Sequence, residues 1–123
     1  MAQSYLIFDF GANEDFVHQA RQRLDGWRQA FRLTGKLDYE FERKPGEKEG
    51  SPEQVRVIIR LSFSDHEKLS YERSLTRIPT EAPFKDAASK VIHSGDADFS
   101  STGDLFHSLN RSQRAADRAS RGR

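Results

Sequence analysis

The feature that most restricts the fold of this chain is a segment in which large apolar residues occupy every second position. These residues are Val55, Val57, Ile59, Leu61 and Phe63. Side chains on a strand point alternately to its two faces, so the pattern predicts a strand with one buried face. The same alternation predicts a second strand over 37–43, and the apolar run 5–10 predicts a third. The chain must therefore build a sheet and cover at least one face of it.

A helix is predicted after the first strand, because Asn13 is a suitable N-cap and an apolar stripe follows it. At about 100° per residue the stripe falls within an arc of roughly 100°. It consists of Phe16, Val17, Ala20, Leu24, Trp27 and Phe31. Gly35 is expected to end the helix as a C-cap. Gly26 costs about 1 kcal/mol inside a helix, so we expect a close backbone approach or a slight bend there.

The segment 69–75 fits both a helix and a strand, and pairing with the preceding strand favours the strand. If residues 64–68 form a hairpin loop, Phe63 lies opposite Leu69 on one face. In the same register Arg60 lies opposite Glu72 on the other face. One register then satisfies both faces, so an antiparallel hairpin is predicted over 55–75.

A second helix is predicted between Thr80 and Gly95, where the apolar residues share one face. The predicted order is β-α-β-β-β-α, an α+β fold with a mostly antiparallel four-stranded sheet and two helices on one face. We assign residues 1–95 to this single two-layer domain and 96–123 to a polar loop and a basic C-terminal extension, with a weaker helix from Thr102. The predicted core contains Trp27, Phe31, Phe41, Ile59 and Phe84.

The formal net charge of +1 conceals a division of charge along the chain. Residues 110–123 carry five arginines against one acid, whereas the other 109 residues carry 15 basic and 18 acidic ones. A segregated basic segment is typical of a polyanion-binding surface. If the segment is helical, one side of it carries what we call the C-terminal stripe: Arg111, Arg114, Arg118 and Arg121.

Further basic residues are expected on the two predicted helices of the domain. Arg21, Arg28 and Arg32 fall within roughly 40° of one another on the first helix. Lys85 and Lys90 lie on the second. Arginine pairs bidentately with phosphate, so these rows predict binding of an RNA backbone without reading of its sequence. Arginines beside an apolar stripe also commonly extend over the edge of a core, which is the structural alternative.

Several functional classes are disfavoured. The chain has no cysteine, which excludes disulfides, thiolate metal sites and a cysteine nucleophile. No apolar run approaches the roughly 18 residues of a membrane span, and the N-terminus lacks the order of a signal peptide. We expect a cytoplasmic protein that has no contact with membranes.

Two partial motifs do not develop into sites. The run Leu6-Ile7-Phe8-Asp9-Phe10-Gly11 shares features with haloacid-dehalogenase phosphatases and with kinases, but it lacks the second aspartate of the former and the catalytic loop of the latter. Residues 96–100 begin like a calcium loop, yet Ser101 stands where the loop needs glycine and His107 where it needs glutamate. We therefore predict no catalytic residues, metal or cofactor.

The order and lengths of the predicted elements resemble those of the ribosome hibernation-promoting factor family, small bacterial proteins of β-α-β-β-β-α topology. The resemblance covers roughly residues 4–94, and the stretch 81–91 is similar to the last helix of that family. Pro83 and Phe84 depart from the usual Asp-Met-Tyr or Asp-Pro-Tyr of the family, and the body of this chain is not basic. The resemblance implies binding to the small ribosomal subunit without catalysis.

Two classes of function stay open from the sequence. The first is a non-enzymatic RNA- or ribosome-associated protein. The second is a protein-interaction or homo-oligomer module that uses an open sheet face, on which Ile58 lies beside Arg56, Arg60 and Glu72. An enzyme built from residues scattered along the sequence is a third, weaker alternative.

Overall fold

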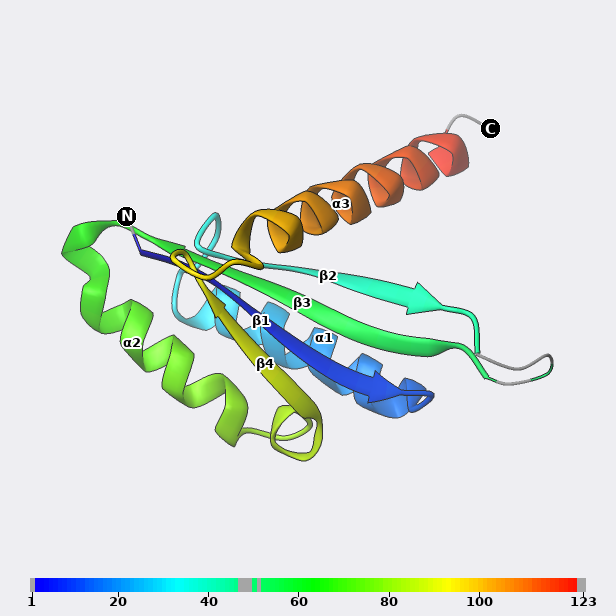
Figure 1. Ribbon diagram of the computed structural model, residues 1–123, viewed down its shortest axis with the longest axis horizontal. Coiled ribbons are helices and arrows are strands. Elements are labelled where there is room, and N and C mark those ends of the chain that lie inside the picture. The colour runs from blue at the N-terminus through cyan, green and yellow to red at the C-terminus, as the bar shows by residue number, and fades with distance from the viewer. Residues whose placement is uncertain (1, 47–49, 51, 122–123) are drawn as a thin grey trace.

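The computed structural model describes residues 2–46, 50 and 52–121, with side chains described as far as residue 111. A four-stranded antiparallel sheet forms the centre of the molecule (Figure 1). The strands are β1 (Ala2–Gly11), β2 (Leu37–Lys44), β3 (Gln54–Phe63) and β4 (Ala88–His93). The helices are α1 (Glu14–Ala30), α2 (Lys68–Arg77) and α3 (Phe99–Arg121). Short 3-10 turns are η1 (Asp65–Glu67), η2 (Ile78–Thr80) and η3 (Phe84–Asp86).

The strand order in the sheet is β2-β3-β1-β4, and each neighbouring pair is antiparallel. β3 therefore lies between β1 and β2, which α1 connects, and β4 returns to the free edge of β1. This is the split β-α-β, or ferredoxin-like, arrangement. The predicted α+β class and the antiparallel four-stranded sheet are confirmed. The arrangement is shared by proteins of many functions and does not identify one.

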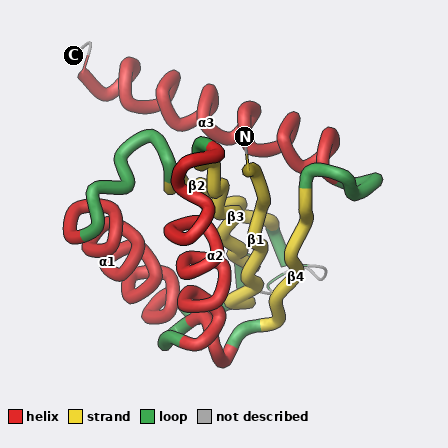
Figure 2. Tube along the Cα trace, turned by 90° about the vertical axis from the view of Figure 1, so that its left-hand side faces the viewer, coloured by secondary structure: helices red, strands yellow, loops and turns green. Residues whose placement is uncertain are grey.

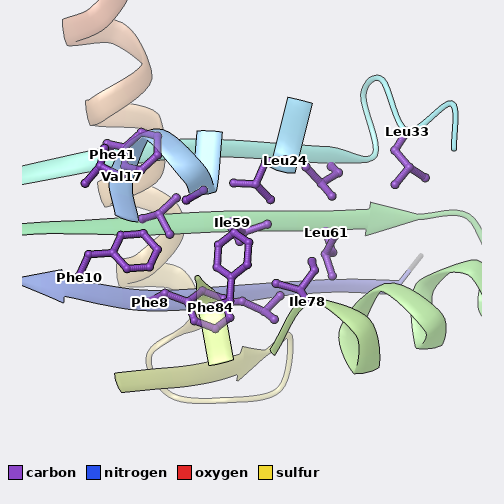
Figure 3. Close-up of a cluster of buried hydrophobic side chains, with 14 of the residues drawn as sticks. Phe8, Phe10, Val17, Leu24, Leu33, Phe41, Ile59, Leu61, Ile78 and Phe84 are labelled. Carbon is purple, nitrogen blue, oxygen red and sulfur yellow. The ribbon is translucent and has the colours of Figure 1, made fainter. Parts of the chain in front are cut away.

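The main core lies between the sheet and the layer formed by α1 and α2 (Figures 2 and 3). Alternate residues of β1 and β3, such as Phe8 and Ile59, meet Val17 and Leu24 of α1 there. Phe84 reaches this core from η3, with its ring centroid 4.9 Å from that of Phe8. The alternating residues that predicted β3 all lie in this core: Val55, Val57, Ile59, Leu61 and Phe63.

A second cluster covers the opposite face of the sheet, where α3 packs (Figure 2). Tyr5, Ile58 and Ile92 of the sheet meet Phe106 of α3. Gly103 permits this contact, because a Cβ there would lie 3.2 Å from the Tyr5 hydroxyl oxygen. α3 crosses the sheet toward β2 and then extends past the β2 edge (Figures 1 and 2). The helix begins at Phe99, and its first turns are part of the packed body rather than a separate extension.

The strand predicted over 69–75 is wrong, because α2 spans this segment. Both edges of β3 are already occupied by β1 and β2, so no partner is left for a hairpin strand. Ser64 starts the turn into the helix: its backbone N–H and hydroxyl donate to Glu67 Oε1 at 3.4 and 2.8 Å. This Ser-x-x-Glu pattern is the capping box of a helix N-terminus.

The pairs predicted for the hairpin are wrong for the same reason. Phe63 meets the ring of Tyr71 on α2, with centroids 5.8 Å apart. Leu69 is 69% exposed on the outer side of that helix. Glu72 also lies on α2, in the layer opposite the sheet face that carries Arg60. The segment 69–75 is therefore helical, although one strand register would have satisfied both faces of a hairpin.

The helix predicted between Thr80 and Gly95 is also wrong. This stretch forms η3 and then β4, which pairs with β1 through contacts such as Ile7 with Lys90. The free edge of β1 supplies a ladder of hydrogen bonds that outweighs the helical preference of the alanines, as tertiary contacts commonly do in strands. Only Ile92 of β4 is buried, so the strand has almost no alternation to detect.

The end of α1 differs from its prediction as well. Phe31 is the C-cap, and Leu33 N–H donates to the Arg28 carbonyl at 2.8 Å. Arg32 adopts the left-handed conformation with φ +56°, so the helix ends before Gly35. Phe31 is consequently 50% exposed instead of buried. The close backbone approach predicted at Gly26 is absent, because a Cβ there would meet nothing within 4 Å.

Candidate nucleic-acid interface

Two of the predicted arginines of α1 lie over aromatic residues of β2. The guanidinium carbon of Arg21 is 5.2 Å from the Phe41 ring centroid, and that of Arg28 is 5.6 Å from the Tyr39 centroid. Arg28 also donates to Asp25 at 3.0 Å and pairs with Asp38 at 3.6 Å. Arg21 has no ion pair within the described part of the chain. Arg21 is therefore the better donor for an external anion.

Tyr39 of β2 holds Asp25 of α1 against the sheet. Its hydroxyl donates to Asp25 Oδ1 at 2.7 Å. Burial first, and then the hydrogen bond and the negative charge of Asp25, raise the pKa of Tyr39 to about 12. Asp25 thus accepts hydrogen bonds from both Tyr39 and Arg28. The charges of Asp25 and Arg28 offset each other, so the contact between α1 and β2 at this point is structural.

The C-terminal end of α1 presents a different arrangement, which we call the Phe31 cluster: Phe31, its neighbour in the chain Arg32, and Arg77. Arg77 of α2 lies over the half-exposed Phe31 ring, with its guanidinium carbon 4.5 Å from the centroid. Arg32 is exposed and forms no ion pair with the residues that the structure describes. Proteins that bind single-stranded nucleic acids use exposed aromatic rings and neighbouring arginines as platforms for unpaired bases, and Phe31 with Arg77 offers one such pair.

The helical layer carries an excess of positive charge although the body as a whole does not. Residues 14–36 hold five basic residues against three acids, and α2 holds three against one. The acids of β2 instead lie on the α3 face, where Asp38 accepts from Arg60 at 2.9 Å and Glu42 from Arg56 at 2.5 Å. The net negative charge of residues 1–109 is therefore not shared by residues 14–36 or by α2.

The sheet face that was expected to be open is covered in part by α3. Ile58 is fully buried, and Arg60 lies 4.8 Å from the Phe106 ring centroid. Asn110 of α3 donates to Glu40 Oε1 of β2 at 2.8 Å. These contacts fix the helix across β3 and β2.

Lys85 and Lys90 do not join the arginines of α1. Lys85 is exposed in η3, and Lys90 lies on β4 at the opposite edge of the sheet from β2. Lys90 Nζ donates to Asp98 at 3.0 Å beside a groove of about 490 Å³ between β4 and the start of α3. Both placements follow from the loss of the predicted second helix.

Only the beginning of the C-terminal stripe can be described. Arg111 is exposed on α3, just after the residue that docks on Glu40. The side chains of Arg114, Arg118 and Arg121 lie outside the described residues. Their backbone belongs to the part of α3 that extends past the β2 edge (Figure 2).

A hollow that the sequence reasoning missed lies on the other flank of α1, and we call it the α1 hollow. It has a volume of about 410 Å³ and is lined by Gln19, Gln22, Arg23, Gly26, Trp27 and Ala82. Trp27 separates it from the core, with its ring centroid 5.8 Å from that of Phe84. Arg23 pairs loosely with Glu81 at 3.9 Å. A glycine inside a helix was the signal in the sequence.

A chain of polar groups joins β1, α2 and β4. The Ser4 hydroxyl is hydrogen-bonded to the Tyr71 hydroxyl and lies 3.2 Å from His93 Nδ1. Ser4 is completely buried, so its hydroxyl serves the hydrogen bonding of Tyr71 and His93 and is not accessible to a substrate. Among the described residues no group of three or more histidines and acids could hold a metal ion. No described helix is long and apolar enough to cross a membrane.

Comparison with models of known protein families and with curated protein sequences finds no match to this chain. The resemblance to the hibernation-promoting factor family stays a prediction. The element order on which it rested differs from the structure after residue 64, where a helix replaces the second strand of the hairpin.

Proposed function

We propose that this chain is a non-enzymatic, cytoplasmic RNA-binding protein that holds the phosphate backbone with arginines of α1 and α3. The observation that carries the proposal is the Phe31 cluster, in which a half-exposed ring lies under Arg77 and the following residue is the exposed Arg32. Arginine can bind phosphate oxygens bidentately and stack on bases, and neither contact reads sequence. The small ribosomal subunit is the RNA partner that the family resemblance suggests.

The backbone at Arg32 supports this assignment. Its φ of +56° lies in the left-handed region, where glycine is favoured and other residues are strained. Gly35, three residues later, also has a positive φ, and there glycine occupies the left-handed position. At residue 32 an arginine occupies it instead. Strained residues concentrate at functional sites. An arginine in this position is explained if its charge is needed at the end of α1.

The placement of charge points the same way. Arg21 and Arg32 belong to the positively charged helical layer, whereas the β2 acids are paired with Arg56 and Arg60 on the other face. α1 and the outer half of α3 both lie toward the β2 side of the sheet (Figure 2). A single strand of RNA passing the β2 edge could contact both groups of arginines.

The test compares charge-matched variants in a titration with fluorescently labelled single-stranded RNA. We expect Arg21→Gln with Arg32→Gln, and glutamine in place of the four arginines of the C-terminal stripe, to weaken binding. Each lost phosphate contact should reduce the slope of log affinity against log salt by up to about one. Lys85→Gln with Lys90→Gln removes the same charge as the first pair from the opposite edge and should leave binding unchanged.

Two results would contradict the proposal. The first is absence of RNA binding by the whole chain at low salt. The second is an equal loss of affinity in the lysine pair, which would show a nonspecific effect of net charge. Co-sedimentation with purified small ribosomal subunits then separates a ribosomal partner from other RNA.

A protein-interaction module is the second candidate, and the β4 edge is the observation that favours it. The outer edge of this strand has no neighbour among the strands of the sheet, and Val91 is 40% exposed on it. Exposed edge strands pair readily with other chains. Light scattering over a range of protein concentrations tests this candidate, since a concentration-independent monomer mass excludes self-association.

A further inference from the structure

We propose that the α1 hollow binds a single unpaired purine base, stacked on Trp27. The hollow lies on the flank of α1 opposite Arg21 and Arg28, so it is distinct from the backbone contacts proposed above. The base could belong to a free nucleotide or to a single-stranded RNA, and in the second case the inference rests on the proposed function. The hollow has a volume of about 410 Å³, and most of the residues that line it are exposed, so a base would reach it directly from solvent.

Gly26 is the first observation behind this inference. Glycine weakens a helix interior, and here no steric contact requires it, because a Cβ would meet nothing within 4 Å. Its φ is not in the left-handed region either. The consequence that the structure does show is space, since Gly26 lines the hollow. A glycine that weakens a helix and that no packing contact requires indicates a functional site.

The groups around the hollow form the second observation. Trp27 provides an aromatic surface, and Gln19 and Gln22 provide amides at its rim. None of these three side chains forms a hydrogen bond within the part of the chain that the structure describes. An amide offers a donor and an acceptor together, which match the N6 and N7 edge of adenine. Stacking and edge recognition are the two contacts by which proteins hold unpaired bases.

Arg23 completes the site with a positive charge. Its only ion pair within the described chain is the loose contact with Glu81, at 3.9 Å, and its side chain is about half exposed. The guanidinium at the edge of the hollow is available for the phosphate of the bound nucleotide. The combination of ring, amides and cation fits a nucleotide better than an apolar or an acidic peptide ligand.

The chain offers a direct probe, because Trp27 is its single tryptophan. A base stacked on the indole should quench its fluorescence. We would titrate the whole chain with AMP, CMP and an adenine-rich single-stranded RNA, and follow labelled RNA in parallel by anisotropy. Quenching is expected with AMP and with the RNA, and about tenfold weaker affinity is expected for CMP.

Gly26→Leu fills the hollow and keeps Trp27, and it should weaken nucleotide affinity at least about tenfold. Gln29→Leu adds the same side chain to an exposed position of α1 outside the hollow and should bind as the parent does. If Gly26→Leu is poorly folded, Gln22→Ala provides the second variant and should reduce the preference for AMP over CMP.

The outcomes separate this inference from the proposed function. Binding of labelled RNA without any change in Trp27 fluorescence would overturn the base site and leave RNA binding intact. Quenching by AMP without RNA binding would support the site as a free-nucleotide site and contradict the proposed function. Equal quenching of the parent and of Gly26→Leu would also overturn the inference. Absence of both signals would remove both proposals.

Discussion

The guanidinium of Arg77 lies over the ring of Phe31, with 4.5 Å between the guanidinium carbon and the ring centroid. This contact joins the C-terminal ends of α1 and α2, which are far apart in the sequence. A cation over an exposed ring contributes about 0.5–1 kcal/mol, enough to favour one ring position without burying it. Phe31 is therefore held in place and still accessible from solvent.

Phe31→Ala should reduce RNA affinity at a moderate cost in stability. The half-exposed ring loses about half of the burial of a core phenylalanine together with its contact with Arg77, so we expect the free energy of unfolding in urea to fall by about 1–2 kcal/mol. Loss of one stacked base should weaken RNA binding by about 1–3 kcal/mol. Leu69→Ala, on the outer side of α2, is the control. RNA affinity equal to that of the parent would show that Phe31 is only a surface residue.

Arg32→Gly should raise the stability of the chain and lower its affinity for RNA. Glycine relieves the positive φ, so the free energy of unfolding should rise by about 1 kcal/mol. RNA affinity should fall, because a phosphate contact is lost. Arg32→Ala removes the same charge but keeps the strained backbone, and it should lose affinity without gaining stability. A stability gain equal in both variants would refute the role of the backbone.

Gly26→Ala should stabilise the chain, because alanine favours the helix by about 1 kcal/mol and its methyl group enters open space. Gly35→Ala should destabilise it by about the same amount, because φ is +80° at this position. Thermal and urea unfolding of the two variants measure both effects. Destabilisation by Gly26→Ala would mean that the space beside Gly26 is filled in solution.

Stability should depend on Tyr39 at high pH. The pKa of Tyr39 is raised to about 12 in the folded chain, by burial and by Asp25, whereas an unfolded tyrosine titrates near 10. The folded state therefore holds this proton more tightly, and its contribution is complete below pH 10 and is lost as the pH rises toward 12. In urea unfolding between pH 9 and 12, the free energy of unfolding should fall more steeply for the parent than for Tyr39→Phe.

Burial also raises the pKa of Tyr5, which accounts for part of the pH dependence that remains in Tyr39→Phe. Parallel curves for the two proteins would contradict the assignment.

The first half of the fold was predictable because its signals are local. Val55 to Phe63 alternate, Asn13 caps α1, and both patterns match the structure. The second half was not, because its outcome depends on which strand edge is free. β4 has one buried residue, Ile92, and is a strand because β1 needs a partner. The Ser64 and Glu67 capping signal was present and would have favoured α2 over a hairpin.

The candidate site was predictable in its charges and not in its geometry. Arg21 and Arg28 both lie on α1 as predicted, whereas Arg32 lies beyond its end and leaves the predicted row. The sequence also does not reveal that Arg28 is neutralised by Asp25 and Asp38. Phe31 was assigned to the core because the helix was expected to continue to Gly35. The predicted hairpin over 55–75 would have kept Arg77 away from the first helix, whereas α2 brings it onto Phe31. The pairing of elements decides these contacts, and pairing is not a local property.

The central position of β1 has a consequence for how the chain reaches this fold. Ala2 pairs with Phe63 and Ser4 with His93, so β1 is synthesised before both of the strands that flank it. Contacts so distant in sequence require closure of long loops, which slows folding relative to a chain with local contacts. Until His93 is available, the apolar β1 segment has an unpaired edge, which is a template for aggregation. Chaperone dependence during synthesis should therefore increase when the return of β4 is delayed.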